Sequence, residues 1–561
     1  MRKYILITAL LVSAGIFAQQ QDSLLRRQME LEREFNPTLQ DANKINSLPS
    51  VPQPTIKKAN TGYSPWAGRT TPPLEIAIPK PTDIMTGIPF SLKKGYISLG
   101  AGNYANIDGA LGYRLIENEK SDLSFNFLHN SSNGDVSYVQ DSDPASNKAF
   151  FMDNMGQLRY GHLLDAFKLN LKAAYSYSAF NYYGNTFGSK RVFDNENQTL
   201  NVFNLGLGVE SNKSDVVNYR GFLDFKNFST KYGEILSDAG LKGNHLDAMV
   251  GLDKPFQGSD SRVGIDGTFR GVFYNGEMDD FMLLSANPYI AFEGLNWKAR
   301  LGADLLIQML GGTKFRVVPN VELELNVTEH SSLYAQIKGG IDDNTYLDMM
   351  NESRYLSPMT SVKSSFSIVD IEAGAKIGEV SGFRFDIFGG FRKTDDEHFL
   401  VLNQLLPEGT SETDKETLAP VYGNLSHTHI GGMIQSNIWS PLDIALRVKK
   451  NIYTVSDTGI PDAKAYNKPG LETDIRATFS AMSNLKFTLN YYFAGDRWSY
   501  FDRVAVKMNN INDLNFGAVY DINDSFALNL KANNLLLQKY DIWYGYPAQG
   551  FNAMGGFTFK F

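Results

Sequence analysis

The 561-residue sequence contains no cysteine, which excludes disulfide-stapled scaffolds and cysteine-ligated zinc sites. Past the first twenty residues it also lacks any apolar run of the roughly 18 residues that a membrane-spanning helix needs, so a helical membrane protein is excluded. Basic residues are not in excess, because 53 Lys and Arg stand against 61 Asp and Glu and leave a formal net charge of −8. A nucleic-acid partner is therefore not expected.

Glycine and aromatic residues are abundant instead, with 49 Gly, 37 Phe and 28 Tyr, which suits an all-β architecture. In segment 297–309, WKARLGADLLIQM, every second residue from Trp297 to Met309 is apolar, and the residues between them are nearly all polar or charged. Successive side chains of a strand point to opposite faces, so one face here is apolar and the other is charged. The same alternation recurs in segments 167–177, 315–327, 383–392, 471–481, 485–493 and 526–532.

Alternation alone fits a soluble β-sandwich as well as an outer-membrane β-barrel, which turns its apolar face to lipid. Three further features favour the barrel. The alternating segments are about ten residues long, the length that crosses a bilayer at a tilt of roughly 45°, and they recur along 94–561 without a competing helical stretch. An export signal precedes them. The last strand, FTFKF, places Phe557, Phe559 and Phe561 on one face and is similar to the C-terminal insertion signal of outer-membrane barrels.

The N-terminal residues predict export. Arg2 and Lys3 are followed by an apolar stretch over 5–17 and by Ala18, which together read as a cleaved signal peptide over 1–18. Residues 19–93 form a second segment, an extended arm, because 10 of the 21 prolines lie within 36–93 and proline removes backbone donors from a sheet. We expect this arm to occlude part of the lumen, together with the long loops near 341–364 and 393–424.

The third segment, 94–561, predicts a transmembrane antiparallel barrel of about 22 strands, with a range of 16–24. Short connections alternate with long ones, as periplasmic turns alternate with extracellular loops in an even-stranded barrel. The long connections are expected at 130–146, 179–197, 341–364, 393–424 and 536–549.

The final stretch, 514–561, resembles the last three strands of TonB-dependent receptors. The resemblance lies in Asn-Asn-Leu at 533–535, in Tyr-Pro at 546–547 and in the closing alternation on phenylalanine. The glutamine-initiated mature end is similar to exported proteins of the Bacteroidota. Members of that receptor family carry a folded plug domain and a short TonB-contacting box, whereas only about 75 Pro-rich residues precede the first strand here. The segments DSLL at 22–25 and LEIAI at 74–78 are the only candidates for such a box.

The resemblance implies an integral outer-membrane protein that binds or passes a solute. The alternative is a non-transporting barrel subunit of a larger outer-membrane complex, and a soluble exported β-repeat protein is a third option. Expected partners are outer-membrane lipid, the barrel-assembly machinery during insertion, and other outer-membrane proteins or surface lipoproteins. No cofactor and no enzymatic activity are expected, because no nucleophile motif stands out.

Charged residues of both signs are predicted to line the lumen, either as a polar substrate path or as a hydrated, self-compensating network. No ring carries a single sign, as an ion-selective filter would. These residues are Lys168, Lys172, Arg220, Asp224, Lys298, Arg300, Asp304, Arg316, Glu322, Glu324, Arg384, Asp386, Asp474 and Arg476.

Tryptophans are predicted to form aromatic belts, with Trp297 and Trp439 at the periplasmic ends of strands and Trp498 and Trp543 near the outer ends. His427 and His429 share a strand face but lack a nearby third ligand, and the acidic segment 408–416 matches no rigid Ca²⁺ cage, so no metal site is predicted. Tyr and Phe residues in the 179–197 loop are candidates for stacking on sugars.

Overall fold

The computed structural model describes residues 93–561, apart from 143, 190, 192, 194–195, 213–215, 234–239, 257–260, 277, 310–312, 359, 381 and 404–414. The predicted signal peptide, the Pro-rich arm to residue 92, both candidate TonB boxes and most of the acidic segment 408–416 lie outside the described residues. Within the described part of the chain, no helix is both long and apolar enough to cross a bilayer.

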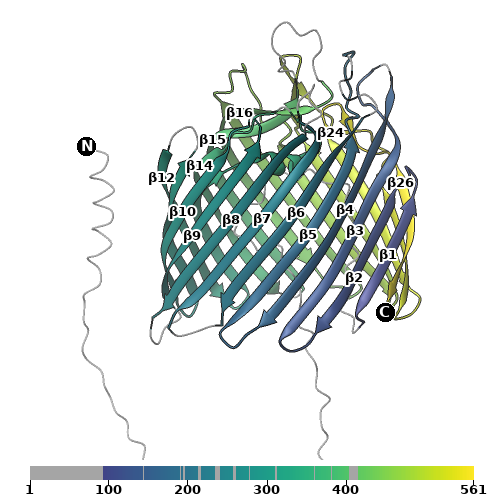
Figure 1. The fold of residues 1–561 in the computed structure, drawn as a ribbon. Helices are drawn as coiled ribbons and strands as arrows, with labels where there is room; N and C mark the ends of the chain where they lie inside the picture. The colour runs from purple at the N-terminus through teal and green to yellow at the C-terminus, as the bar shows by residue number, and fades with distance from the viewer. Residues whose placement is uncertain are drawn as a thin grey trace, which may run out of the picture. The chain divides into compact units, whose positions relative to one another are not determined.

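Twenty-two antiparallel strands form one closed sheet, in which β1 pairs with β2 on one side and with β26 on the other (Figure 1). Backbone hydrogen bonds of 2.9 Å between Gly95 and Phe561 tie the ends of the first and last strands together. The barrel strands are β1 (Gly95–Gly102), β2 (Ile107–Glu117), β3 (Ser121–Ser137), β4 (Ser146–Leu163), β5 (Phe167–Asn181), β6 (Asn197–Ser211), β7 (Asn218–Gly233), β8 (Gly240–Pro255), β9 (Arg262–Asn275), β10 (Phe281–Glu293), β11 (Trp297–Met309), β12 (Thr313–Thr328), β13 (Ser331–Asp342), β14 (Ser365–Val380), β15 (Phe383–Leu402), β16 (Leu418–Ser436), β17 (Leu442–Ser456), β18 (Leu471–Met482), β19 (Leu485–Gly495), β22 (Ile511–Asp521), β23 (Phe526–Asn533) and β26 (Asn552–Lys560).

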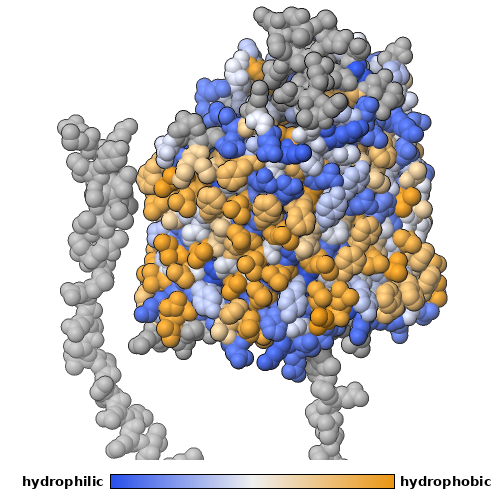
Figure 2. Space-filling view, viewed as in Figure 1, coloured by the Kyte–Doolittle hydropathy of each residue, from blue (hydrophilic) through white to orange (hydrophobic). Residues whose placement is uncertain are grey.

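The apolar face of the strands is the outer face of the barrel. On the face in view, Figure 2 shows hydrophobic residues gathered over the barrel strands, with hydrophilic residues toward both ends. Leu301 on β11 and Leu323 on β12 lie opposite Val321 and Ala299 in the register and are 43% and 46% exposed. The closed ring leaves no strand edge unpaired, so this band meets hydrocarbon without an unsatisfied backbone group. The prediction of a transmembrane barrel of about 22 strands is confirmed.

The long connections differ from the prediction, because strands β3, β4, β15 and β16 continue well beyond the apolar band. About half of each of the predicted loops 130–146 and 393–424 is strand, and β15 alone runs for 20 residues. The hydrogen-bonded ladder persists there, but the apolar alternation of the membrane band does not. The end of β15 is apolar on both faces, because Leu400 and Leu402 pack in one buried cluster while Phe399 and Val401 pack in another. Two small hairpins, β20 (Trp498–Phe501) with β21 (Val504–Lys507) and β24 (Asp541–Trp543) with β25 (Tyr546–Pro547), and the helix α2 (Tyr346–Glu352) also lie in the long connections.

Candidate functional site

The candidate site is the outer mouth of the barrel, where the long connections fold together into a cap. Its centre is the β13–β14 connection, which carries helix α2. Thr345 caps this helix, since its hydroxyl accepts a 3.1 Å hydrogen bond from the backbone N–H of Asp348, and Asp348 places a negative charge in the first turn. The buried side chains of the helix are Tyr346, Leu347, Met349 and Met350.

Helix α2 packs against an apolar collar on the inner wall of the barrel. Phe228, Val272 and Val318 belong to the inward-facing rows of β7, β9 and β12 and are almost fully buried against the cap. The ring of Tyr346 stacks on Phe228 with 6.1 Å between centroids, and the backbone N–H of Tyr346 donates to the hydroxyl of Tyr274 at 3.0 Å. The lumen-facing row is thus polar along much of its length but apolar where the cap docks.

Ion pairs to the barrel wall hold both ends of the β13–β14 connection. Arg270 on β9 bonds the carboxylate of Asp343 at 2.8 Å, just before the helix. Arg354, just after the helix, bonds Asp153 on β4 at 2.8 Å and lies over the ring of Phe151. Charged hydrogen bonds of this kind are stronger than neutral ones and fix the orientation of the connection.

Other connections join the same cap. Glu416, fully buried at the outer end of the β15–β16 hairpin, accepts a hydrogen bond from the backbone N–H of Phe193 in the β5–β6 connection, and Arg191 lies 3.6 Å from its carboxylate. The hydroxyl of Tyr546 donates to the backbone carbonyl of Glu416, and its ring stacks on Tyr355 at 4.0 Å. The mouth is therefore spanned by loops that bond to one another as well as to the wall.

Asp541, in the β24–β25 hairpin, is a buried acid within this cap. Burial raises the pKa of its carboxyl to about 6, against the opposing effects of hydrogen bonds from Gln140 and from the backbone N–H of Gly545 and of the charge on Arg497. Burial also lowers the pKa of Arg497 to about 10, and this guanidinium donates to the carbonyl of Asp541 at 2.8 Å. Arg497 thus stays charged at neutral pH, whereas the carboxyl of Asp541 titrates about one pH unit below neutrality.

The register places the charges predicted to line the lumen on the strand face opposite the apolar rows, and many are already paired. Arg220 and Arg300 share Asp266 at 2.6 and 2.8 Å. Further contacts among the predicted residues are Lys298 with Glu293, Glu322 with Lys338, Asp474 with Arg476, Asp224 with Asn204 and Lys226, Asp304 with Asn287 and Asn320, Arg316 with Gln308, and Arg384 with Gln435.

Four predicted lumen residues, Lys168, Lys172, Glu324 and Asp386, form none of these pairs. Glu324 lies opposite Lys298 in the register, and Asp386 is buried on β15. Asp266 is not among the predicted lumen residues, although it occupies an alternating strand position on β9 of the same kind. Arg270, Asp343 and Arg354 are not among them either, because their pairing depends on how the loops fold back and leaves no pattern in the local sequence.

The predicted aromatic and histidine positions are distributed as follows. Trp297 and Trp439 are 42% and 59% exposed at the short-turn end. Trp543 is wrongly assigned to a belt, because it is 3% exposed within the apolar core of the cap, and Trp498 lies in the β20–β21 hairpin. His427 and His429 lie 5.2 Å apart by ring centroids, with His427 bonded to Asn451 at 3.0 Å. In the part of the chain that the structure describes, no group of three or more His, Asp or Glu side chains is placed to hold a metal ion.

The C-terminal strand presents its phenylalanines to the exterior. Phe557 and Phe559 lie opposite Leu99 and Ile97 of β1, and Phe559 and Phe561 are 41% and 43% exposed. Phe561 also stacks on Tyr113 at 5.9 Å. These aromatic side chains therefore belong to the lipid-facing surface at the seam where the barrel closes.

No protein-family model matches the sequence, and no curated protein matches it either. Solved structures do match the fold. They include the ferric-catecholate import receptor Fiu of E. coli K12, with a TM-score of 0.61 and 10% identity over 84% of this chain and 82% of that chain. The siderophore receptor PirA of Acinetobacter baumannii gives a TM-score of 0.64 and 10% identity over 84% and 80%. The pyoverdine outer membrane receptor FpvA of Pseudomonas aeruginosa PAO1 gives 0.61 and 14% over 84% and 79%. The chain therefore has the 22-stranded barrel fold of outer-membrane receptors.

Proposed function

We propose that this protein is an outer-membrane receptor of the TonB-dependent type that binds a solute at its outer side and passes it through the barrel. The observation that carries the proposal is the fold match over 84% of the chain to receptors named for siderophore import and binding. A ring of 22 strands encloses a lumen that is wide enough for a solute and needs filling. Its wall offers charges of both signs, which suits a polar solute.

The cap makes passage conditional. A hydrogen-bonded barrel wall is rigid, so a solute enters only if the loops across the mouth move. The cap is held by noncovalent contacts alone, such as the Arg354–Asp153 and Arg270–Asp343 pairs, and these are reversible. We propose that the Pro-rich segment 19–93 occludes the inner side in place of a folded plug domain, after removal of a signal peptide over 1–18. On this proposal a solute has to release an outer and an inner closure.

Conductance in planar bilayers tests this assignment. The variants are a deletion of residues 20–90, a replacement of residues 344–363 by a Gly-Ser linker of equal length, and both changes together. We expect the unmodified barrel to be silent and the double variant to conduct, because it lacks both closures. The single variants show which closure limits the current.

A silent double variant that co-purifies with other outer-membrane proteins would refute passage and favour the scaffold alternative. The shift in electrophoretic mobility on heating, which reports a folded barrel, controls for misfolding in each variant. Substitution of Lys120, in the short β2–β3 turn, by alanine serves as the control, because this exposed residue lies at the end of the strands opposite the cap.

A further inference from the structure

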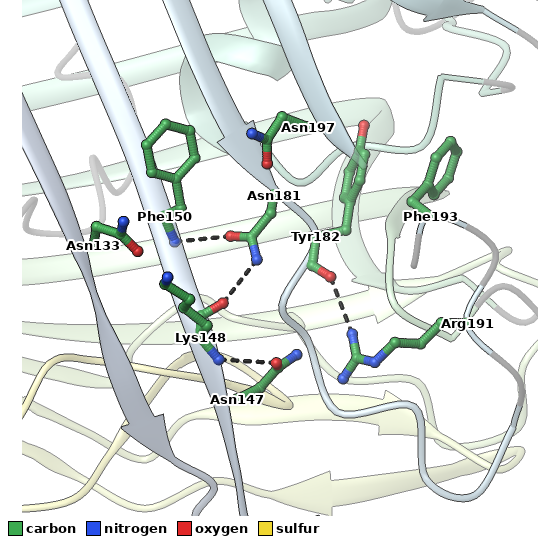
Figure 3. A pocket seen from close by; sticks show the side chains of 9 residues that line it. All are labelled: Asn133, Asn147, Lys148, Phe150, Asn181, Tyr182, Arg191, Phe193 and Asn197. Carbon is green, nitrogen blue, oxygen red and sulfur yellow. Dashed lines mark hydrogen bonds between the residues drawn. The ribbon is translucent and has the colours of Figure 1, made fainter. Parts of the chain in front are cut away.

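A pocket of about 310 Å³ lies at the rim of β3–β6, where the β5–β6 connection of the cap meets the barrel wall (Figure 3). Asn133 and Phe150 face each other across β3 and β4, and Asn181 and Asn197 do so across β5 and β6. Tyr182, Arg191 and Phe193, from the β5–β6 connection, close its far side, and Asn147 and Lys148 complete the lining.

The height of the pocket above the membrane follows from the register. Phe127, Tyr175 and Phe203 form one row across β3, β5 and β6 on the outer face and are 37–51% exposed, as expected of an aromatic girdle at the lipid–water interface. Asn133 and Asn181 lie six residues further along their strands. At roughly 3.3 Å per residue and a barrel tilt near 40°, the pocket lies about 15 Å beyond the girdle, above the hydrocarbon and among the headgroups.

Two of the four amides are already used within the protein. The side chain of Asn181 accepts from the backbone N–H of Phe150 at 2.8 Å and donates to the carbonyl of Lys148 at 2.7 Å, which prolongs the β4–β5 ladder to the rim (Figure 3). The side chain of Asn147 accepts from the N–H of Lys148 at 2.8 Å. These bonds order the wall of the pocket. The guanidinium of Arg191 is also engaged, because it donates to the carbonyl of Tyr182 at 3.1 Å.

The remaining polar groups surround an aromatic ring. Figure 3 shows Asn133, Lys148 and Asn197 around the half-buried ring of Phe150. Among the described residues, the amides of Asn133 and Asn197 and the ammonium of Lys148 have no protein hydrogen-bond or ion-pair partner. Planar amides suit sugar hydroxyls, a ring face accepts the C–H side of a sugar, and an ammonium binds phosphate as a point charge.

We propose that this pocket binds the phosphorylated saccharide headgroup of a glycolipid in the outer leaflet. The location selects a membrane lipid over a free sugar, because the pocket opens on the outer wall of the barrel, directly above the lipid-facing band. Such a lipid buries its acyl chains against the apolar band while its headgroup reaches the rim. The groups offered to the ligand, Asn133, Lys148, Phe150 and Asn197, belong to the barrel strands and not to the loops across the mouth, so the proposal holds whether or not the barrel transports a solute.

Titration in phosphatidylcholine nanodiscs tests the proposal, with native mass spectrometry as the readout of bound glycolipid. The probe is rough-type lipopolysaccharide, which carries lipid A and inner-core sugars, and a second arm uses lipid A without core sugars. We expect rough lipopolysaccharide to bind the wild type, and Lys148→Ala and Phe150→Leu each to weaken binding about tenfold. The control Lys120→Ala makes the same charge change in the short β2–β3 turn and is expected to bind like the wild type.

Three outcomes would overturn the proposal: equal binding by Lys148→Ala and Lys120→Ala, equal binding of lipid A with and without core sugars, or displacement by millimolar inorganic phosphate, which would identify a simple anion site. A heat-dependent electrophoretic shift in every variant shows that the barrel has folded. Loss of binding in a variant that keeps this shift then reports on the pocket itself.

Discussion

Replacement of Tyr346 by alanine should release helix α2 from the barrel wall without unfolding the barrel. The Tyr346 side chain is completely buried, and it stacks on Phe228, which is itself fully buried on the inner wall. The helix has seven residues and too few internal hydrogen bonds to be stable alone. Its position therefore depends on the side chains that it buries.

The magnitude follows from the loss of a fully buried aromatic side chain. Large-to-small substitutions of this kind cost about 3–5 kcal/mol, and we expect the free energy of opening the β13–β14 connection to fall by up to that amount. At 1.4 kcal/mol per factor of ten, exchange of its amides should accelerate by up to about a hundredfold to a few thousandfold, and no further once the connection is fully open. The 22-strand ladder is unaffected, so protection of the barrel strands should not change.

Hydrogen exchange followed by mass spectrometry, compared between peptides from 343–364 and from the barrel strands, measures both effects. The matched control is Tyr346→Phe. The hydroxyl of Tyr346 is buried without a hydrogen-bond partner among the described residues, and such a group costs about 1–3 kcal/mol, so its removal should leave exchange unchanged or slower. Unchanged exchange in the alanine variant, or exchange in the phenylalanine variant as fast as in alanine, would refute the reasoning.

Three further predictions concern the cap and the wall. The pKa of Asp541 rises from 3.8 to about 6 in the folded cap. Protonated Asp541 therefore contributes about 3 kcal/mol to the stability of the folded cap below pH ~3.8, and this contribution is lost as pH rises through 6. Hydrogen exchange of the β24–β25 amides, corrected for the intrinsic rate, should accelerate over that range, and the acceleration should be absent in Asp541→Asn. In a double-mutant cycle, Arg354→Ala and Asp153→Ala should each lower the free energy of opening the cap. The loss in the double variant should be about 1.5–3 kcal/mol smaller than the sum of the two single losses, whereas additive losses would show that the pair is not coupled. Leu301→Arg should lower the free energy of unfolding of the barrel in vesicles by about 2–4 kcal/mol, measured by refolding from urea, and Leu301→Ile should stay near the wild type. Equal urea midpoints for the arginine variant and the wild type would show that this side chain does not face lipid.

The sequence by itself determined the barrel, because every strand that crosses hydrocarbon repeats the same constraint. One face must be apolar and the other wet, and this period of two is readable in each segment, for example from Trp297 to Met309. The strand count and the outward position of Phe559 followed from the same rule. Where the membrane ends, the rule ends, and β15 was predicted about ten residues too short.

Only the tertiary structure decided the cap and the rim pocket. Glu416 contacts the backbone of Phe193, more than 200 residues away in sequence, and Arg354 meets Asp153 across the mouth. Loop sequences have no periodicity from which such partners could be predicted. Each partner depends on which strand ends the closed ring brings close together. The pairing of Asn133 with Phe150 at the rim likewise depends on strand register beyond the membrane, where polar side chains on either face satisfy water equally well.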